Sequence, residues 1–235
     1  MVSLSFTDNA VCYVSAKRKK YNLEMTDSGS IKLERDCIID GHMIRPKAVY
    51  SAVERLLNGI DIDEVKVTAI SPDVRKTTVE AVCTGKKPEA DLEKAASAVV
   101  PADFVFDYRL TGNRMSDDGS SIYTADVYYA DRQLVLGYRN MLAFFGCHHL
   151  YMDSFLHCVE RFAETEGARG LMLRLRMSRG SAEYSIDKDG VVGEIFSREK
   201  LAADEYSRDT MQFYGNISDD VLCAAVTMFG GRGAE

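Results

Sequence analysis

The sequence predicts an α/β protein in which mixed β-sheets carry helices on their faces. One observation is the pattern of apolar residues, which alternates with period two in many short segments and follows helical spacing in others. A second is the order of these segments: hairpins, helix, strands, helix, strands, helix, strand, helix, a three-stranded meander, and a last helix and strand. A third is size, since 235 residues at 46% hydrophobic can bury the cores of two closely packed subdomains. Helices placed between strands in this order give layered mixed sheets.

The clearest helix is predicted to begin at Pro46, because proline is tolerated in the first helical turn. Asn58 and Gly59 supply its end. Apolar residues at helical spacing form the stripe that should face a sheet: Val49, Val53, Leu56 and Leu57.

The other elements are predicted from the same two periodicities. Residues 3–37 are expected to form two hairpins, with turns at residues 8–9, in the basic run 17–20, and at residues 27–30. Further strands are expected at residues 65–70, 76–82, 104–110, 122–129, 147–152, 171–177, 182–186, 191–196 and 221–228. Further helices are expected at residues 88–98, 131–145, 153–167 and 200–214. Asp131 and Asp153 are expected to cap the second and third of these.

The charge balance argues against a nucleic-acid partner. The formal net charge is −7, and phosphate-backbone binding relies on clustered Lys and Arg. No run approaches the 18 or more apolar residues of a membrane span, and the N-terminus lacks the pattern of a signal peptide, so we expect a cytoplasmic protein without membrane insertion. The 6 cysteines form no C-x-x-C pair and are expected to be buried thiols.

Two clusters of potential functional groups favour structural roles. Cys147, His148, His149, His157 and Cys158 include zinc-ligand types, but neighbouring positions on a strand or helix point apart, so we predict no metal site.

The second cluster consists of carboxylates that flank the first helix. Their residue types suit turns and caps rather than acid–base chemistry. They are Asp36, Asp40, Asp61 and Asp63.

Four segments, taken in order, carry a resemblance to a known family. They are residues 38–49 (IIDGHMIRPKAV), residues 131–146, the turn 187–190 followed by 195–199, and residues 226–231 (VTMFGG). These segments are similar to those of PilM, the type IV pilus assembly protein family, and more distantly to the cell-division protein FtsA. Both belong to the actin-like ATPase superfamily.

The resemblance implies an actin-like, ribonuclease H-like core with an inserted small α+β subdomain of the SHS2-like kind. Residues 1–37 and 131–166 would form the first actin-like subdomain, residues 38–130 the insertion, and residues 167–235 a reduced second subdomain. Full PilM chains carry another subdomain before the final Gly-Gly turn, where this sequence has only residues 199–220.

The resemblance also marks two phosphate loops, and the sequence departs from both. Such loops need small residues, so that backbone N–H groups approach the phosphates, and a carboxylate that orients Mg²⁺. In the first loop Ser5 stands at the acid position, Thr7 at the first glycine and Cys12 at the lysine. In the second loop Arg176 stands at the acid position and Ser178 at the glycine.

These departures predict a degenerate ATPase with no catalytic residues and no cofactor. The alternative is a nucleotide-binding actin-like ATPase with a divergent phosphate loop, or an FtsA-like cell-division protein. A retained site would bind ATP with Mg²⁺ through Asp8, Asn9, Gly230 and Gly231.

PilM-like proteins bind the cytoplasmic N-terminal peptide of the inner-membrane protein PilN, so the resemblance implies a PilN-like partner here. The residues expected near that site are Met43, Ile44, Lys47, Val49 and Val67. The implied function is a non-enzymatic scaffold of a type IV pilus or secretion-type assembly platform. It would be peripheral to the inner membrane through its partner, with self-association as a further possibility.

Overall fold

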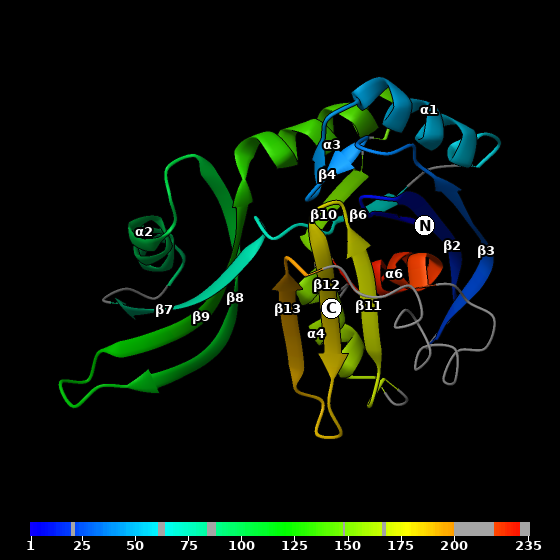
Figure 1. Ribbon diagram of the computed structural model, residues 1–235. Helices are drawn as coiled ribbons and strands as arrows, with labels where there is room; N and C mark the ends of the chain where they lie inside the picture. Colours follow the sequence, from blue (N-terminus) through cyan, green and yellow to red (C-terminus); the bar gives the residue numbers. More distant parts are fainter. Residues whose placement is uncertain are drawn as a thin grey trace. The chain divides into compact units, whose positions relative to one another are not determined.

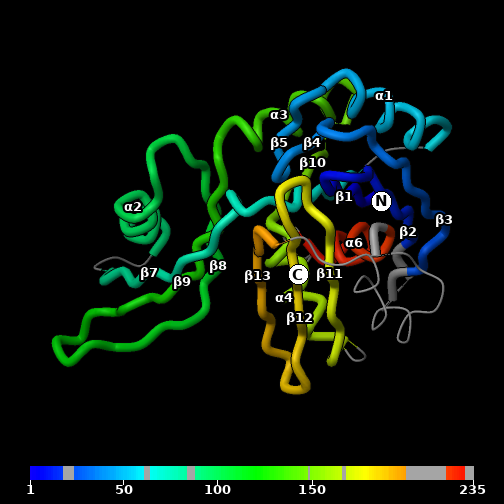
Figure 2. Tube along the Cα trace, viewed as in Figure 1, coloured from blue at the N-terminus to red at the C-terminus, as the bar shows by residue number. Residues whose placement is uncertain are grey.

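The computed structural model describes residues 1–19, 22–60, 64–83, 88–147, 149–165, 168–199 and 219–230. The chain divides into two compact units. The larger comprises Met1–Pro72 and Gly137–Glu235, and the smaller comprises Asp73–Leu136. Figures 1 and 2 trace the chain through both units.

A five-stranded mixed sheet forms one half of the larger unit (Figure 1). Its strands are β1 (Val2–Phe6), β2 (Ala10–Lys19), β3 (Asn22–Lys32), β6 (Glu64–Ala69) and β10 (His149–Ser154), in the order β10-β6-β1-β2-β3. The first three strands are antiparallel to one another, whereas β6 runs parallel to both β1 and β10. All five residues of β1 are buried, so this strand is the centre of the sheet and of its core.

The third strand corrects the expected pair of hairpins. Residues 27–30 do not turn but continue β3 alongside β2, with one register irregularity at Ser15/Ala16. The hydroxyl of Tyr13 donates to Asp27 at 2.6 Å, and a Cβ at Gly29 would lie 2.7 Å from that ring. Gly29 therefore makes room for a cross-strand tyrosine, and this contact outweighs the turn propensity of the local residues.

Two helices and a short hairpin complete this layer. The hairpin pairs β4 (Ile38–Ile39) with β5 (His42–Met43), and α1 follows at Pro46–Leu57 with the predicted proline start and buried stripe. Helix α3 spans Arg132–Phe144, and Asp131 caps it as predicted by accepting from the N–H groups of Gln133 and Leu134 at 2.7 and 3.1 Å.

The predicted three-stranded meander forms the second sheet of the larger unit. It consists of β11 (Met172–Met177), β12 (Gly180–Ile186) and β13 (Val192–Ser197), all antiparallel. Helices α4 (Phe155–Ala163) and α6 (Asp219–Thr227) pack against it and share one core with it. Helix α6 also packs on β1 and β2, so it lies between the two sheets.

Polar contacts hold α6 to the five-stranded sheet. The Ser3 hydroxyl donates to the Ala224 carbonyl at 2.5 Å, and the hydroxyls of Thr68 and Thr227 are 2.8 Å apart. Lys66 Nζ donates to the carbonyls of Met228 and Gly230 at 2.8 and 2.6 Å, which satisfies acceptors at the end of the helix. Burial lowers the pKa of Lys66, the largest of several influences on it.

Helix α6 overturns the prediction of a buried strand at residues 221–228. The helix is apolar on nearly every side because it is covered by β2 on one face and by α4 and the meander on another. A short run that is apolar all round looks the same in sequence whether it is a buried strand or a buried helix. The helix expected at residues 200–214 lies outside the described residues.

A second correction concerns the start of α4. The cap is Ser154, whose hydroxyl accepts from the His157 N–H at 3.0 Å, rather than the predicted Asp153. Asp153 instead accepts from the His157 ring, with Nδ1 to oxygen distances of 3.0 and 2.9 Å.

The smaller unit has the element order strand, helix, strand, strand. Strands β7 (Arg75–Cys83), β8 (Phe104–Met115) and β9 (Ser121–Asp131) form a sheet with β9 in the middle, and α2 (Glu89–Val99) covers one face. On the other face Asp126 is nearly buried, and its carboxylate lies 2.9 Å from Lys76 Nζ and accepts from the Thr78 hydroxyl at 3.0 Å.

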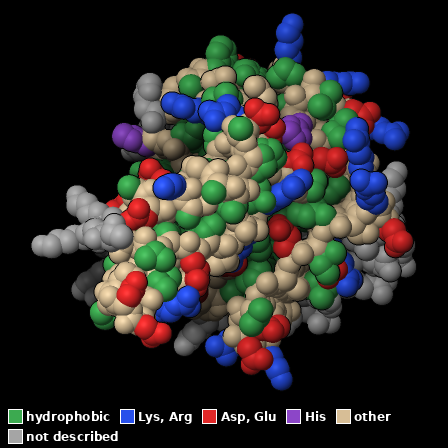
Figure 3. All heavy atoms as spheres, turned by 90° about the vertical axis from the view of Figure 1, so that its left-hand side faces the viewer, with side chains coloured by type: hydrophobic (Ala, Val, Ile, Leu, Met, Phe, Trp, Pro, Cys, Tyr) green, Lys and Arg blue, Asp and Glu red, His purple; other side chains and the backbone are tan. Residues whose placement is uncertain are grey.

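The boundaries of the smaller unit differ from the expected insertion at residues 38–130. Strand β6 pairs with β1 and β10, and α1 packs on β2 and β3, so residues 38–72 belong to the larger unit. Charges of both signs are interspersed on the face shown in Figure 3. Among the described residues, no helix combines the length and apolarity that crossing a membrane would require.

A half-buried glutamate, Glu194, should make stability depend on pH. Burial raises the pKa of Glu194 to about 7, partly opposed by a hydrogen bond from Tyr184. The folded state therefore binds the proton more tightly than the unfolded state, and ionisation above the ordinary pKa of 4.5 favours unfolding. We expect the wild type to lose about 2 kcal/mol of unfolding free energy between pH 5 and pH 8 relative to Glu194→Gln, measured by urea denaturation. The exposed Glu164→Gln serves as control, and equal pH dependence in all three proteins would contradict this assignment.

Candidate functional site

The carboxylate of Asp8 joins three separate loops of the larger unit. Asp8 lies in the turn between β1 and β2 and is 1% exposed. Its oxygens accept from the backbone N–H groups of Asp40 and Gly41 at 3.1 and 3.2 Å. A third donor, the N–H of Ser178 in the turn between β11 and β12, lies 2.5 Å away. A buried charge needs such donors, so this side chain is fully engaged in holding the loops.

The loops around Asp8 are shaped to present those donors. Asp40 has φ 51° and Gly41 has φ 84°, the left-handed conformation that points successive N–H groups to one side. A Cβ at Gly41 would lie 2.6 Å from Cβ of Ser71, so only glycine fits there. The buried hydroxyl of Tyr138 donates to the Gly41 carbonyl at 2.7 Å, which ties α3 to the same turn.

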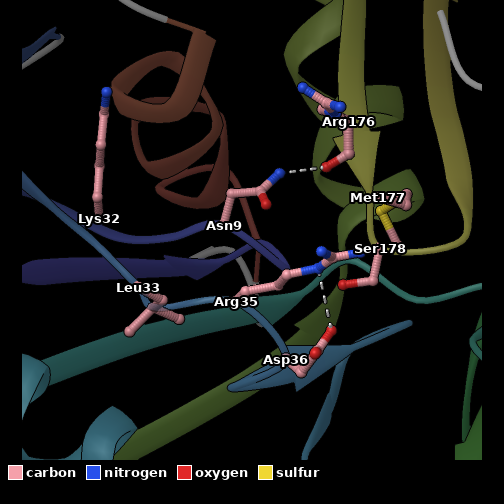
Figure 4. Close-up of a pocket in the computed structure, with 8 residues that line it drawn as sticks. All are labelled: Asn9, Lys32, Leu33, Arg35, Asp36, Arg176, Met177 and Ser178. Atoms are coloured by element: carbon pink, nitrogen blue, oxygen red, sulfur yellow. Dashed lines mark hydrogen bonds and ion pairs between the residues drawn. The ribbon is translucent and has the colours of Figure 1, made fainter.

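A second bond joins the two hairpin turns directly. Asn9 Nδ2 donates to the Arg176 carbonyl at 2.7 Å (Figure 4), next to the bond between Asp8 and Ser178. The Ser178 hydroxyl also donates to the Ile38 carbonyl at 3.1 Å. The turns that the resemblance marks as phosphate loops are therefore held against each other by the protein's own side chains.

The residues at the expected positions of the first phosphate loop are buried within the β1–β2 hairpin, whereas Arg176 of the second loop is exposed. Ser5 and Cys12 have no exposed surface, and Cys12 packs in the core beside α6. Thr7 uses its hydroxyl within its own turn, accepting from the Ala10 N–H at 3.0 Å. All three side chains thus lie inside the β1–β2 hairpin.

The predicted nucleotide residues do not all come together. Asp8 and Asn9 share one turn, but Gly230 lies against Asp153 and Cys158 and accepts from Lys66. Gly231 lies outside the described residues.

A pocket of about 710 Å³ opens beside the joined turns. Figure 4 shows its lining: Asn9, Lys32, Leu33, Arg35, Asp36, Arg176, Met177 and Ser178. These residues come from the β1–β2 turn, the end of β3 and the segment after it, and the end of β11. Three of the side chains are cationic and one is acidic, so the pocket is positive in an acidic protein.

The residues predicted near a partner peptide fall into two groups. Val49 and Val67 are 0% and 1% exposed and belong to the core of the five-stranded sheet and α1. Ile44 is 54% exposed, Lys47 is also exposed, and Met43 is half-buried beside Gly137 of α3. Only the second group can reach a partner without a rearrangement.

The histidine and cysteine cluster has structural contacts. His157 is held by Asp153, and Cys158 is fully buried with its pKa raised chiefly by that burial. Cys147 is buried, His149 is exposed, and His148 lies outside the described residues. Within the part of the chain that the structure describes, no three potential ligands gather in a way that could hold a metal ion.

Comparison with known proteins identifies the fold and no more. No family model and no curated protein matches the sequence. A solved PilM–PilN type IV pilus biogenesis complex contains a chain that matches 97% of this chain over 68% of its own length, with a TM-score of 0.61 and 14% identity. An Aquifex aeolicus PPX-GPPA enzyme (TM-score 0.37, 9% identity) and an Aquifex aeolicus Ppx/GppA phosphatase (TM-score 0.37, 8% identity) are much weaker matches. They cover 85% and 90% of this chain, which spans 52% and 59% of theirs.

The match to the PilM–PilN complex confirms the predicted fold class, a mixed α+β protein with an actin-like fold. The five-stranded sheet has three antiparallel strands, β3, β2 and β1, followed by β6 and β10, which run parallel to β1. Identity of 14% shows the fold alone.

Sequence reasoning missed the part played by Asp8 as a link and the cationic side chains of the pocket. Asp8 lies in a predicted turn, and Asp40 is among the carboxylates whose residue type suits turns, but their contact joins positions 32 residues apart. Lys32 and Arg35 are ordinary surface types, and only the fold brings them beside Arg176.

Removing the Asp8 carboxylate should destabilise the larger unit strongly. Asp8→Ala leaves three backbone donors without an acceptor, at about 1 kcal/mol or more each, so we expect a loss of about 3 kcal/mol or more by urea denaturation. Millimolar formate or acetate should restore part of the lost unfolding free energy, because the same N–H groups line the space that the Asp8 carboxylate leaves. The exposed Asp189→Ala should change little and respond to neither anion. A loss below about 1 kcal/mol would show that Asp8 does not hold the loops.

Proposed function

We propose that this protein is a PilM-like cytoplasmic scaffold of a type IV pilus or secretion-type assembly platform. It would bind the N-terminal peptide of an inner-membrane partner similar to PilN, and so be peripheral to the inner membrane. The observation that carries this proposal is the match of 97% of this chain to a chain of a solved PilM–PilN type IV pilus biogenesis complex.

The contacts around Asp8 support a role without ATP hydrolysis. A nucleotide bound in the manner of the superfamily needs free N–H groups in the loops and a carboxylate for Mg²⁺. Here the carboxylate accepts from three N–H groups, one of which belongs to the opposite turn. Opening this arrangement for phosphates would leave the Asp8 charge without those donors, which is costly.

The two units support an assignment of subdomains. The smaller unit, residues 73–136, has the strand, helix, strand, strand order expected of an SHS2-like insertion. The five-stranded sheet with α1 and α3 corresponds to the first actin-like subdomain. The meander with α4 and α6 corresponds to a reduced second one.

The partner peptide is proposed to bind around the segment that leads into α1. Ile44 offers an exposed apolar side chain and Lys47 a charge beside it, on a helix whose other face is fixed in the core. A rigid helix with an exposed apolar residue at its start suits recognition of a short amphipathic peptide. Val49 and Val67 would act only by supporting this surface.

Substitutions on this surface should weaken peptide binding without unfolding the protein. The probe is a labelled peptide from the cytoplasmic N-terminus of the inner-membrane protein encoded beside this gene, measured by fluorescence anisotropy. Lys47→Glu should weaken binding about fivefold, the effect of about 1 kcal/mol at a rim charge, and Ile44→Asp should weaken it more.

The matched control is Lys188→Glu in the exposed turn between β12 and β13, which should leave affinity unchanged. If the peptide binds but Lys47→Glu and Ile44→Asp bind equally well, the site lies elsewhere. Absence of any peptide binding would contradict the scaffold itself.

ATP turnover separates the scaffold from an ATPase. Phosphate release from millimolar Mg-ATP should not exceed that of a heat-inactivated sample. Reproducible turnover that Asp8→Asn abolishes at a temperature where this variant remains folded would contradict our proposal and favour the divergent ATPase.

A further inference from the structure

The pocket beside the joined turns has the chemistry of an anion site. Lys32 extends from the end of β3, Arg35 from the segment after it, and Arg176 from the end of β11. In Figure 4, Lys32 and Arg176 stand on either side of Asn9, and Arg35 crosses beneath it toward Ser178. Cations from two distant parts of the chain, residues 32–35 and Arg176, thus line one pocket, an arrangement that no single charged helix or turn produces.

These cations have little compensation from the protein. Neither Lys32 nor Arg176 forms an ion pair with a described residue. Arg35 lies 4.0 Å from Asp36, and the two side chains are 90% and 50% exposed, so this contact is weak. Three cations and one acid leave an excess of positive charge in a chain whose net charge is −7. Like charges held together without partners favour a bound anion.

We propose that this pocket binds a small multivalent anion through the side chains of Lys32, Arg35 and Arg176. The volume of about 710 Å³ falls in the usual range for small-molecule sites. Leu33 adds apolar contact for the body of such a ligand. The arginines can pair with phosphate or carboxylate groups through two N–H donors each, while lysine adds a point charge.

The site differs from a phosphate loop in both its donors and its metal requirement. Loop N–H groups beside it already donate to Asp8, and Asn9 already donates to the Arg176 carbonyl. Side-chain cations supply the positive charge that Mg²⁺ would otherwise bring, so binding should not require Mg²⁺. The ligand chemistry is therefore two or more phosphates or carboxylates on one small molecule.

Isothermal titration of the full chain in EDTA tests this site with two probes, pyrophosphate and citrate. The pocket variant is Lys32→Gln with Arg176→Gln. The matched control, Arg55→Gln with Arg139→Gln, removes the same charge from exposed positions on α1 and α3. We expect at least one probe to bind the wild type. It should bind the pocket variant at least about tenfold more weakly and the control within about twofold.

Tighter binding of pyrophosphate than of citrate would indicate a phosphorylated ligand. Equal or tighter binding of citrate would indicate a polycarboxylate ligand. Both results support the site. Three results would overturn the site. The first is that neither probe binds the wild type more tightly than millimolar. The second is that the pocket variant binds with the same affinity as the wild type, and the third is that the control loses as much affinity as the pocket variant. Because every substituted residue is exposed, loss of the fold should not obscure the result, and thermal unfolding of each variant checks this.

Discussion

The structure of the larger unit depends on one buried carboxylate. Asp8 is 1% exposed, yet it meets three backbone donors from the β4–β5 and β11–β12 turns. A charge at this depth is tolerable only while those donors remain in place, so the carboxylate and the turns fix one another. Tyr138 extends the same network to α3 through the Gly41 carbonyl. One side chain thereby links the β1–β2 turn of the five-stranded sheet to the short hairpin and to the meander.

Helix α6 holds the two sheets together by a different means. Its apolar faces pack on β2 and on the meander, and Ser3, Lys66 and Thr68 bind its polar groups from the five-stranded sheet. Lys66 satisfies two carbonyls at its end, where a positive charge also meets the negative end of the helix dipole. Packing thus orders the interior, while Asp8 orders the turns at one edge.

The sequence was sufficient where local chemistry decides the outcome. Pro46, the stripe ending at Leu57 and the cap at Asp131 predicted α1 and α3 correctly. The sequence was insufficient where tertiary contacts determine the structure. Strand β3 continues through turn-forming residues because Tyr13 contacts Asp27. Helix α6 was predicted as a strand because its residues are apolar on nearly all sides, as they are in a buried strand. The candidate site could be predicted only in part. Asp8 and Asn9 are neighbours in the sequence, whereas Arg176 is far from Lys32 and Arg35.

The contacts of Asp8 also bear on how an actin-like fold could lose hydrolysis and keep its architecture. Loop N–H groups that bind phosphate would be left unsatisfied without a ligand, at a cost comparable to a lost hydrogen bond for each group. A carboxylate from the chain itself accepts from such groups and removes that cost permanently. The turns can then remain ordered without nucleotide, as the proposed scaffold role requires. Positive charge lies beside these turns on Lys32, Arg35 and Arg176, so the anion site that we propose uses side chains where the backbone donors are already taken.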